Sequence, residues 1–374
     1  MLNLTELEQR ALDTPINLAD GHPRQELTDS QLKVVYRFPE LFETAQVESF
    51  RELERSAQTE FLHALGQRTA PVADERVFSV YSSSVATMVV GNVLADLGHE
   101  VALVHPTFDN LHDILVRKVR VRPLSEADCA TADLSGAVAA GATCVFVTTP
   151  NNPTGWFLDR DALARLAAAC AHHGLLLCLD VSFRGFDTRA QFDNYEVLEA
   201  AGVSYVVIED TGKLWPVSEL KLGFLAVSAD LRHAVDHVLS EVLLTVSPFV
   251  LRLVELLALD AVDGGFERLR GLVAENRRLV TTALHSLDGI DLVDPDARVS
   301  VCRIGVGSAA EAERVRAGLV DRAVHVLPCD QFHWARPGEG AGQLRLALAR
   351  DRDLLADGLR RLAEVWRAVP TGST

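Results

Sequence analysis

Short apolar runs alternate with segments of helical periodicity between residues 76 and 208, and this alternation narrows the folds open to the chain. The apolar runs predict strands at 76–81, 101–104, 143–147, 175–179 and 205–208. The segments between them predict helices at 85–97, 111–118 and 159–172. This order indicates an α/β fold, in which helices cover both faces of a mostly parallel sheet. Ligands of such sheets bind beyond the carboxyl ends of the strands.

The strand predicted at 205–208 ends in an acidic pair, and a short turn of small residues then presents Lys213. A lysine at the end of a buried strand is costly unless it stays exposed, is paired, or reacts with a lowered pKa. A neutral lysine can form a Schiff base with a carbonyl cofactor, whereas this turn alone would favour a solvated lysine. Other groups suited to ligand binding follow predicted strands: Ser82, Ser83, Ser84, Phe108, Asn152 and Asp180.

Three consecutive serines, Ser82 to Ser84, stand where the first strand turns into a helix. Free backbone amides and hydroxyls at a helix N-terminus suit a phosphate group. The same serines can also act only as helix caps, which requires no ligand. The sequence leaves both alternatives open.

Residues 1–30 are polar and precede the alternating pattern, and we expect them to form an arm that closes over the active site. Apolar residues between 4 and 12 are spaced for one short amphipathic helix. The turn-rich segment 17–24 then brings an acid and an imidazole, Asp20 and His22, close together in the sequence. A solvated loop is the alternative interpretation.

The character of the chain changes after about residue 255, where long helical segments replace the alternating pattern. A helix is predicted at 264–287, and a strand–helix–strand–strand–helix run follows it. We therefore expect a large domain at 31–255 and a smaller α+β C-terminal domain at 256–374.

The net charge of −16 at neutral pH argues against nucleic acid or an anionic membrane as a partner, since both attract basic patches. No apolar run approaches the roughly 20 residues that a membrane span requires. The first residues lack the pattern of a secretory leader. We expect a cytoplasmic protein that acts on a small molecule.

Six cysteines show no CxxC spacing and several stand in apolar runs, so we expect buried, reduced thiols. His105, His172, His173 and His333 lack the spacing typical of metal ligands, and no metal is expected. His172 and His173 end a predicted helix, where the helix dipole alone explains them.

With these residues in view, the sequence resembles the fold-type I pyridoxal 5′-phosphate (PLP) enzymes of the aspartate aminotransferase superfamily. The resemblance rests on motifs that occur in the order of that superfamily: Asn152-Pro153-Thr154-Gly155, Asp180-Val181-Ser182-Phe183, Lys213 with Lys221 and Gly223, and Leu344-Arg345-Leu346-Ala347. It implies a PLP cofactor, the fold-type I transferase fold and a homodimer.

The resemblance assigns a role to each matching residue. Lys213 would hold the cofactor and move the substrate's Cα proton, and Asp180 would pair with the pyridinium nitrogen, which makes the ring an electron sink. Arg345 would bind the substrate carboxylate as a bidentate pair. Cofactor contacts are implied for Ser82, Ser83, Ser84, Phe108, Asn152, Ser182 and Lys221.

Three positions depart from the usual aminotransferase pattern. Phe183 stands where these enzymes usually carry tyrosine, Lys221 where they carry arginine, and Asp210 where they carry a phosphate-binding serine. A carboxylate would be repelled by phosphate, so we expect Asp210 to face a cationic substrate. The departures argue against ordinary transamination.

A smaller group accounts for these departures. The sequence is similar to the PLP- and oxygen-dependent L-arginine oxidases and hydroxylases of antibiotic biosynthesis, of the enduracididine, azomycin and indolmycin types. The similarity runs nearly from end to end, and its most specific segments are Asp20-Gly21-His22 and Glu209-Asp210-Thr211-Gly212-Lys213. It implies dioxygen as co-substrate, and His22 as the catalytic residue linked to water addition. Candidate ligands of the arginine guanidinium are Glu8, Asp20 and Asp210.

The implied reaction converts L-arginine through quinonoid intermediates to 4-hydroxy-2-oxoarginine and some 2-oxoarginine, with release of ammonia and hydrogen peroxide. Three alternatives remain open. The first is an oxidase or 4,5-desaturase that adds no water, and the second is a conventional aminotransferase that needs a 2-oxo acid. The third, a PLP-binding regulator without turnover, is disfavoured because the chain is acidic and no helix-turn-helix segment is predicted.

Overall fold

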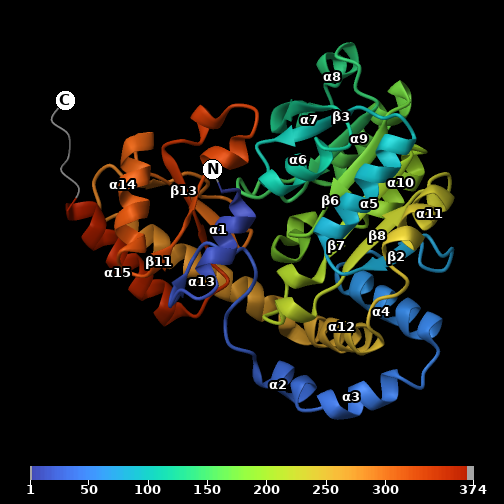
Figure 1. Cartoon of the computed structure of the whole chain (residues 1–374), viewed down its shortest axis with the longest axis horizontal. Coiled ribbons are helices and arrows are strands. Elements are labelled where there is room, and N and C mark those ends of the chain that lie inside the picture. The colour runs from blue at the N-terminus through green and yellow to red at the C-terminus, as the bar shows by residue number, and fades with distance from the viewer. Residues whose placement is uncertain (1, 369–374) are drawn as a thin grey trace.

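The computed structural model describes residues 2–368, which form two lobes with the N-terminal arm lying against both (Figure 1). The larger lobe holds a seven-stranded sheet, and the smaller lobe, from the C-terminal part of the chain, holds a four-stranded sheet. Residues 369–374 of the expected C-terminal domain lie outside the described residues.

The strands of the large sheet lie in the order β2-β8-β7-β6-β5-β3-β4. Their bounds are Val77–Val80 (β2), Val101–His105 (β3), Val121–Ser125 (β4), Cys144–Thr148 (β5), Leu176–Asp180 (β6), Tyr205–Asp210 (β7) and Gly223–Val227 (β8). Neighbouring strands are parallel except at β8, which runs antiparallel to both β2 and β7. The expected mostly parallel sheet is confirmed, and the carboxyl ends of all its strands but β8 share one edge.

Apolar side chains on both faces of the strands explain why helices cover the sheet on two sides. In β3, Ala102 and Val104 belong to one cluster of the core, and Val101 and Leu103 belong to the other. One face is covered by α5 (Ser83–Asp96), α6 (Asp109–Leu115) and α11 (Arg232–Val242). The other is covered by α4 (Phe50–Ala64), α9 (Arg160–His173), α10 (Asn194–Ala201) and α12 (Pro248–Asp260). Two short helices, α7 (Glu126–Thr131) and α8 (Ser135–Ala139), lie between β4 and β5 in the chain.

The smaller lobe combines an antiparallel sheet with three helices. Its strands are β9 (Asp291–Leu292), β10 (Val301–Gly305), β12 (Leu327–Pro328) and β13 (Gln343–Ala347). Its helices are α13 (Phe266–Leu284), α14 (Ala309–Val320) and α15 (Arg352–Ala368), and the π-helical turn Ala261–Gly265 leads from α12 into α13. The expected boundary between residues 255 and 256 falls within α12, and it stays a prediction.

The arm is hydrogen-bonded into the small lobe. Its strand β1 (Ile16–Asn17) pairs in parallel with β11 (Val324–His325). Beyond β1, the amide of Leu18 donates to the carbonyl of His325 (2.9 Å), and the carbonyl of Leu18 accepts from the amide of Ala347 (2.8 Å). Its helix α1 (Leu4–Ala11) reaches the large lobe, where the amide of Leu4 donates to the carboxylate of Asp109 (2.8 Å). The arm therefore bridges the two lobes.

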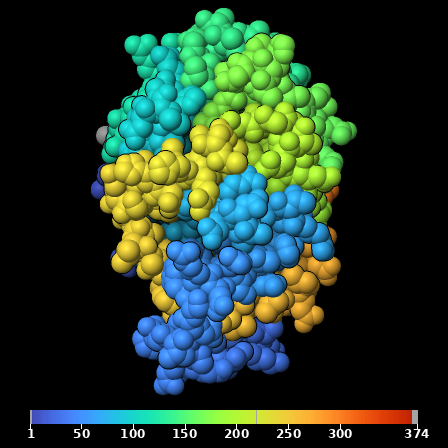
Figure 2. Space-filling view, turned by 90° about the vertical axis from the view of Figure 1, so that its right-hand side faces the viewer, coloured from blue at the N-terminus to red at the C-terminus, as the bar shows by residue number. Residues whose placement is uncertain are grey.

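Helices α2 (Asp29–Val35) and α3 (Phe38–Ala45) lead from the arm to α4, and this blue segment shares one side of the molecule with the yellow segment around α11 (Figure 2). Large apolar side chains are exposed in both segments: Tyr36, Phe42, Val47 and Leu244. Exposed apolar surface of this kind marks a place where another protein surface can bind.

Short 3₁₀ helices follow several strands. Three of them carry residues discussed below: η3 (Thr211–Lys213), η6 (Asp330–His333) and η7 (Pro337–Glu339). The others are η1 (Arg184–Phe186), η2 (Thr188–Ala190) and η4 (Ser218–Leu220).

All six cysteines are buried and unbridged, as expected from the sequence. Within residues 2–368, no helix has both the length and the apolar character that crossing a bilayer requires.

Candidate active site

A cavity opens at the carboxyl edge of the large sheet, with α1 of the arm contributing to its wall. Eight of the predicted site residues line it: Glu8, Ser83, Ser84, Phe108, Asn152, Asp180, Ser182 and Lys213. Five others contact this lining or adjoin it in the chain without being part of it: Asp20, His22, Ser82, Asp210 and Arg345. The sixth, Lys221, contacts His22 instead. The structure thus gathers residues that are far apart in the sequence around one cavity.

Asp180 ends β6 in the wall of the cavity. Ser182 donates both its amide (3.0 Å) and its hydroxyl (2.6 Å) to Asp180 Oδ1. Burial raises the pKa of Asp180, although the hydrogen bonds from Ser182 oppose that shift. A buried carboxylate in this state would gain a favourable interaction from a cationic ring nitrogen in the cavity.

The N-terminus of α5 carries the three serines. Ser82 is the N-cap residue, whose hydroxyl accepts from the amide of Val85 (3.3 Å). Ser83 donates its hydroxyl (2.6 Å) and its amide (3.3 Å) to Asp210 Oδ2, and Asp210 Oδ1 accepts from the amide of Gly212 (2.8 Å). Asp210, which the sequence placed at the substrate guanidinium, is therefore already hydrogen-bonded to this helix end.

The pKa of Asp210 depends on two opposing effects. Burial alone would raise it, but the positive charges of Lys213 and Lys221, together with the hydrogen bond from Ser83, outweigh burial and lower it below its usual range. Asp210 is therefore ionised at neutral pH, in a cluster of cationic groups that balances its charge.

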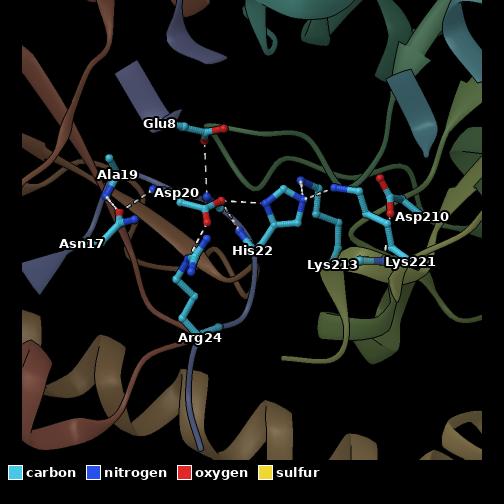
Figure 3. Close-up of polar contacts among 12 residues, drawn as sticks. Glu8, Asn17, Ala19, Asp20, His22, Arg24, Asp210, Lys213 and Lys221 are labelled. Carbon is cyan, nitrogen blue, oxygen red and sulfur yellow. Dashed lines mark hydrogen bonds and ion pairs between the residues drawn. The ribbon is translucent and has the colours of Figure 1, made fainter. Parts of the chain in front are cut away.

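Asp20 and His22 continue this polar cluster from the arm to the two lysines (Figure 3). His22 Nδ1 donates to Asp20 Oδ1 at 2.6 Å, and this bond selects the tautomer in which Nε2 carries the lone pair. That Nε2 lies 3.3 Å from Lys213 Nζ and 3.2 Å from Lys221 Nζ. Arg24 Nε donates to Asp20 Oδ2 at 2.6 Å. Both oxygens of Asp20 are thus engaged within the arm, so in this structure Asp20 positions His22 rather than facing the cavity.

The surroundings of Asp20 and His22 determine the protonation state of each side chain. Burial alone would raise the pKa of Asp20, but the hydrogen bonds from the ring and the backbone of His22, together with the charge of Lys213, hold it far below its usual range. Burial lowers the pKa of His22, and the charge of Lys213 lowers it further, while Asp20 partly opposes both effects. At neutral pH Asp20 is ionised and His22 is neutral, so His22 Nε2 is able to accept a proton.

Arg345 of β13 is fully buried and its guanidinium lies between the two lobes. It donates to Asn152 Oδ1 (3.3 Å) in the large lobe and to Glu8 Oε1 (3.0 Å) and the carbonyl of Ala19 in the arm. The ring of Phe332 packs against it at 5.4 Å. Arg345 and Glu8, which the sequence assigned to opposite ends of the substrate, therefore pair with each other here.

Arg350 is a residue of the site that the sequence did not reveal. Its buried guanidinium donates to the arm carbonyls of Asn17 (2.6 Å), His22 (2.8 Å) and Asp20. Burial lowers its pKa to about 10, which leaves it charged at neutral pH. Arg350 therefore holds the turn that carries His22, and only its position soon after the motif Leu344-Arg345-Leu346-Ala347 could have drawn attention to it.

The donor set of the cavity fits PLP. Lys213 supplies an amine, Phe108 an aromatic face, and Asp180 a buried carboxylate for a ring nitrogen. The N-terminus of α5 supplies amides and hydroxyls for a phosphate. Gly212 makes space for Lys221 beside this helix end, because a Cβ on Gly212 would lie only 2.6 Å from Lys221 Cδ.

Comparison with known proteins agrees with this site. A family model described as aminotransferase class I and II matches residues 13–362. A solved structure of MppP soaked with the product 2-ketoarginine is 42% identical, has a TM-score of 0.90, and is matched over 94% of this chain and 99% of that chain. The aspartate aminotransferase of Thermus thermophilus with maleate is 17% identical, with a TM-score of 0.78 over 98% of this chain and 97% of the other. This last likeness concerns the fold alone, and it confirms the expected fold-type I architecture.

Among curated proteins, the histidinol-phosphate aminotransferase of Roseiflexus castenholzii is 26% identical over 226 residues. The alignment covers 60% of this chain and 56% of that relative. The chain therefore matches little more than half of the length of this relative, and the relative's activity does not transfer to it directly.

Proposed function

The chain belongs to the class I and II aminotransferase family, and from this premise we propose that it uses PLP to oxidise L-arginine with dioxygen. The proposed products are 4-hydroxy-2-oxoarginine with some 2-oxoarginine, ammonia and hydrogen peroxide. The 42% identity to MppP, which was soaked with 2-ketoarginine, supports arginine as the substrate.

One observation carries the proposal beyond the family. The imidazole of His22 lies 3.3 Å from Lys213 Nζ and is oriented by the ionised carboxylate of Asp20. Transfer of the Cα proton requires one base, which Lys213 provides. A second, neutral base at the same place supports a further proton transfer, such as the activation of water.

In this proposal, different residues around the cavity bind different groups of the substrate. When bound, PLP supplies an electron sink for the electrons of the substrate's Cα–H bond. Lys213 Nζ takes the Cα proton, and Asp180 stabilises the positive ring nitrogen. Arg345 and Asn152 hold the substrate carboxylate, and Glu8 and Asp210 are proposed for the guanidinium.

His22 acts on water in this proposal. Its Nε2 accepts a proton from a water molecule that adds at Cγ of the substrate, while Asp20 stabilises the imidazolium that forms. The arm excludes bulk water, because its backbone is hydrogen-bonded to the small lobe and to Arg350. Water addition is thereby limited to the position beside His22.

The two products differ in their demand for oxygen. Each 2-oxoarginine requires one O₂ and one water, and it yields one ammonia and one hydrogen peroxide. Each 4-hydroxy-2-oxoarginine requires two O₂ and two waters, and it yields one ammonia and two hydrogen peroxide. The hydroxyl oxygen comes from water, so the ratio of O₂ consumed to ammonia released reports the product mixture.

The test mixes PLP-loaded enzyme with L-arginine and follows O₂, ammonia and product mass. We expect between one and two O₂ per ammonia, and a product one oxygen heavier than 2-oxoarginine. Under ¹⁸O₂ the hydroxyl group should remain unlabelled. If no O₂ is consumed and turnover begins only after a 2-oxo acid is added, the protein is an aminotransferase and the proposal is wrong.

Conventional transamination is the second candidate, because the curated relative is an aminotransferase. 2-Ketoarginine would also result from transamination of arginine, so the likeness to MppP supports the substrate without selecting the oxidant. An oxidase or 4,5-desaturase that adds no water is distinguished by consuming O₂ without forming the heavier product.

The remaining expectations are part of this proposal. A homodimer is supported by the exposed apolar side chains of the α2–α4 and α11 segments (Figure 2). We also propose a cytoplasmic enzyme, as expected from the sequence, and a role in the biosynthesis of a specialised metabolite, which the resemblance implies. Light scattering of the purified enzyme tests the dimer, for which an Leu244→Lys variant should shift the protein toward the monomer.

A further inference from the structure

Three ligand-bearing side chains from separate segments meet outside the cavity. His105 ends β3 of the large lobe, while His333 and Glu339 end η6 and η7 of the small lobe. One imidazole nitrogen from each histidine and one carboxylate oxygen all lie within 4.8 Å of one another. The sequence argued against a metal because these residues lack a characteristic spacing, but the fold brings them together.

Three of the four ring nitrogens of these two buried histidines lack a hydrogen-bond partner among the described residues. His105 is 7% exposed and His333 is 6% exposed. Among the residues that the structure describes, no hydrogen-bond partner is found for Nε2 of His105 or for either ring nitrogen of His333. Buried polar atoms are costly when unpaired, so these nitrogens require a partner that the protein itself does not provide.

Aromatic packing accounts for the burial of the rings in this cluster, but it gives their nitrogens no hydrogen-bond partner. The rings of His105 and His333 meet edge to face at 5.5 Å, and His105 meets Trp334 in the same way at 5.4 Å. Trp334 stacks on His112 at 4.4 Å. Such contacts involve ring faces and edges. The lone pairs in the plane of each imidazole are left for another partner.

The carboxylate is held close to the second imidazole. Glu339 Oε2 lies 3.6 Å from His333 Nδ1, while its Oε1 accepts from Arg336 (3.1 Å). Gly340 allows this approach, since a Cβ there would lie 2.6 Å from His333 Cδ2.

We propose that His105, His333 and Glu339 bind a divalent transition-metal ion of the zinc class. Two imidazoles and one carboxylate are ligands that zinc accepts, with water at the fourth position of a tetrahedron. Zinc ligands about 2.0–2.1 Å from the metal lie roughly 3.3 Å apart. The ligand atoms here lie within 4.8 Å of one another, so binding requires a shorter separation. The side chain of Glu339 is 46% exposed and is free to move toward the buried imidazoles.

The ion would fasten the small lobe to the large one beside the cavity. Next to His105, the amide of Thr107 donates to the carbonyl of Phe332 (3.1 Å), and Phe108 packs against Phe332 at 5.7 Å. Phe108 lines the cavity. The metal would therefore have a structural role, since it stabilises the segment that presents Phe108 and touches none of the reacting groups.

The test titrates zinc chloride into tag-free, PLP-loaded protein that has been dialysed against a chelator. Calorimetry and elemental analysis should give one zinc ion per chain. Glu339→Gln and His333→Gln should each weaken zinc binding by at least roughly 10–100-fold, the loss typical of even supporting groups around a metal. His173→Gln is the matched control, because His172 and His173 form a second histidine pair, with rings 5.0 Å apart.

Cobalt(II) gives a second readout, because tetrahedral coordination by imidazole and carboxylate produces intense visible absorption bands. Glu339 is partly exposed, so Glu339→Gln should fold normally, which circular dichroism can verify. Zinc should raise the thermal midpoint of the wild-type protein and not that of Glu339→Gln. The proposal is overturned if the wild type binds no zinc, or if zinc binds equally well after both substitutions.

Discussion

Glu8 Oε1 lies 3.0 Å from Arg345 Nη2, so the arm places its own carboxylate on the guanidinium that we assign to the substrate carboxylate. Arg345 is fully buried, and a buried guanidinium without an anionic partner would be strongly destabilising. Glu8 provides that partner in this structure. In the proposed reaction, the substrate carboxylate would replace Glu8, which would become available to the guanidinium at the other end of arginine.

This exchange predicts opposite effects of Glu8→Gln on two substrates. The variant should raise the KM for L-arginine about tenfold, because one charge-assisted hydrogen bond worth roughly 1.4 kcal/mol is lost. For L-norleucine, which has no guanidinium, the KM should fall, because a competing carboxylate is removed. Steady-state O₂ consumption with each amino acid measures both values.

Glu6→Gln is the control for Glu8→Gln. Glu6 lies on the same helix, is exposed, and caps the N-terminus of α1 through a contact that glutamine can keep. It should leave both KM values unchanged. Equal effects of Glu8→Gln on the two substrates would contradict the exchange.

Two lysines are almost equally distant from His22 Nε2, and the assignment of their roles can be tested chemically. Reduction of the PLP-loaded enzyme with borohydride, followed by peptide mass mapping, should place the cofactor on Lys213 alone. Lys221→Ala should leave this label in place and weaken PLP binding roughly tenfold, since one phosphate contact is lost. A label on Lys221 would reverse the two roles.

His22→Phe should change the product rather than stop the reaction. The ring keeps its volume but loses both nitrogens, so water addition should slow by roughly 10²-fold. Arginine should still be consumed, and the ratio of O₂ to ammonia should fall toward one. A variant that retains the heavier product in full would exclude His22 as the base for water.

The pH dependence of the product mixture follows from the lowered pKa of His22. Burial and the charge of Lys213 lower the pKa of His22 below its ordinary value of 6.5. His22 therefore stays neutral as the pH falls to 6.5. The hydroxylated fraction should therefore stay constant from pH 8 to about 6.5 and decrease only at lower pH. Asp20→Asn removes a group that raises this pKa, so any acid decrease that remains should move to still lower pH. A decrease that begins above pH 6.5 would contradict the shift.

The raised pKa of Asp109 predicts that the free energy of unfolding of the protein depends on pH. Burial raises its pKa from 3.8 to about 6, although the amide of Leu4 donates to it. Between these values the unfolded chain is ionised while the folded chain stays protonated, so this group's contribution to stability is lost as pH rises through about 6. At pH 8 the cost approaches about 3 kcal/mol.

Asp109→Asn keeps an acceptor for the amide of Leu4 without the charge. It should be more stable than the wild type at pH 8, and this advantage should shrink as the pH falls below about 6. Urea denaturation at pH 5.5 and 8 measures the difference, and Asp113→Asn on the same helix is the control. A variant less stable than the wild type at pH 8 would mean that the charge of Asp109 holds the arm in place.

Much of the large lobe could be predicted because its strands are apolar on both faces. Strand β4 (Val121–Ser125) was missed, since Arg122 and Pro123 give this edge strand no apolar pattern. Strand β8 (Gly223–Val227) was missed as well. Its antiparallel direction could not have been predicted, because side-chain periodicity does not encode the direction of a strand.

The rule that ligands bind beyond strand ends located the cavity residues on the large lobe. It could not predict which of them pair with one another. The contacts of Asp210 with Ser83, of Glu8 with Arg345 and of His105 with His333 join distant segments, and each depends on how the lobes and the arm pack. Arg350 was missed for the same reason, since its partners are arm carbonyls that no local pattern reveals.

The pairing of β1 with β11 makes the arm a part of the small lobe. If the lobes separate to admit the proposed substrate, that movement would also withdraw His22 from Lys213. The proposed base for water would then return only when the lobes meet again around the substrate. Closure of the cavity and the return of His22 would be one event, so the connectivity of the backbone would set the order of the proposed steps.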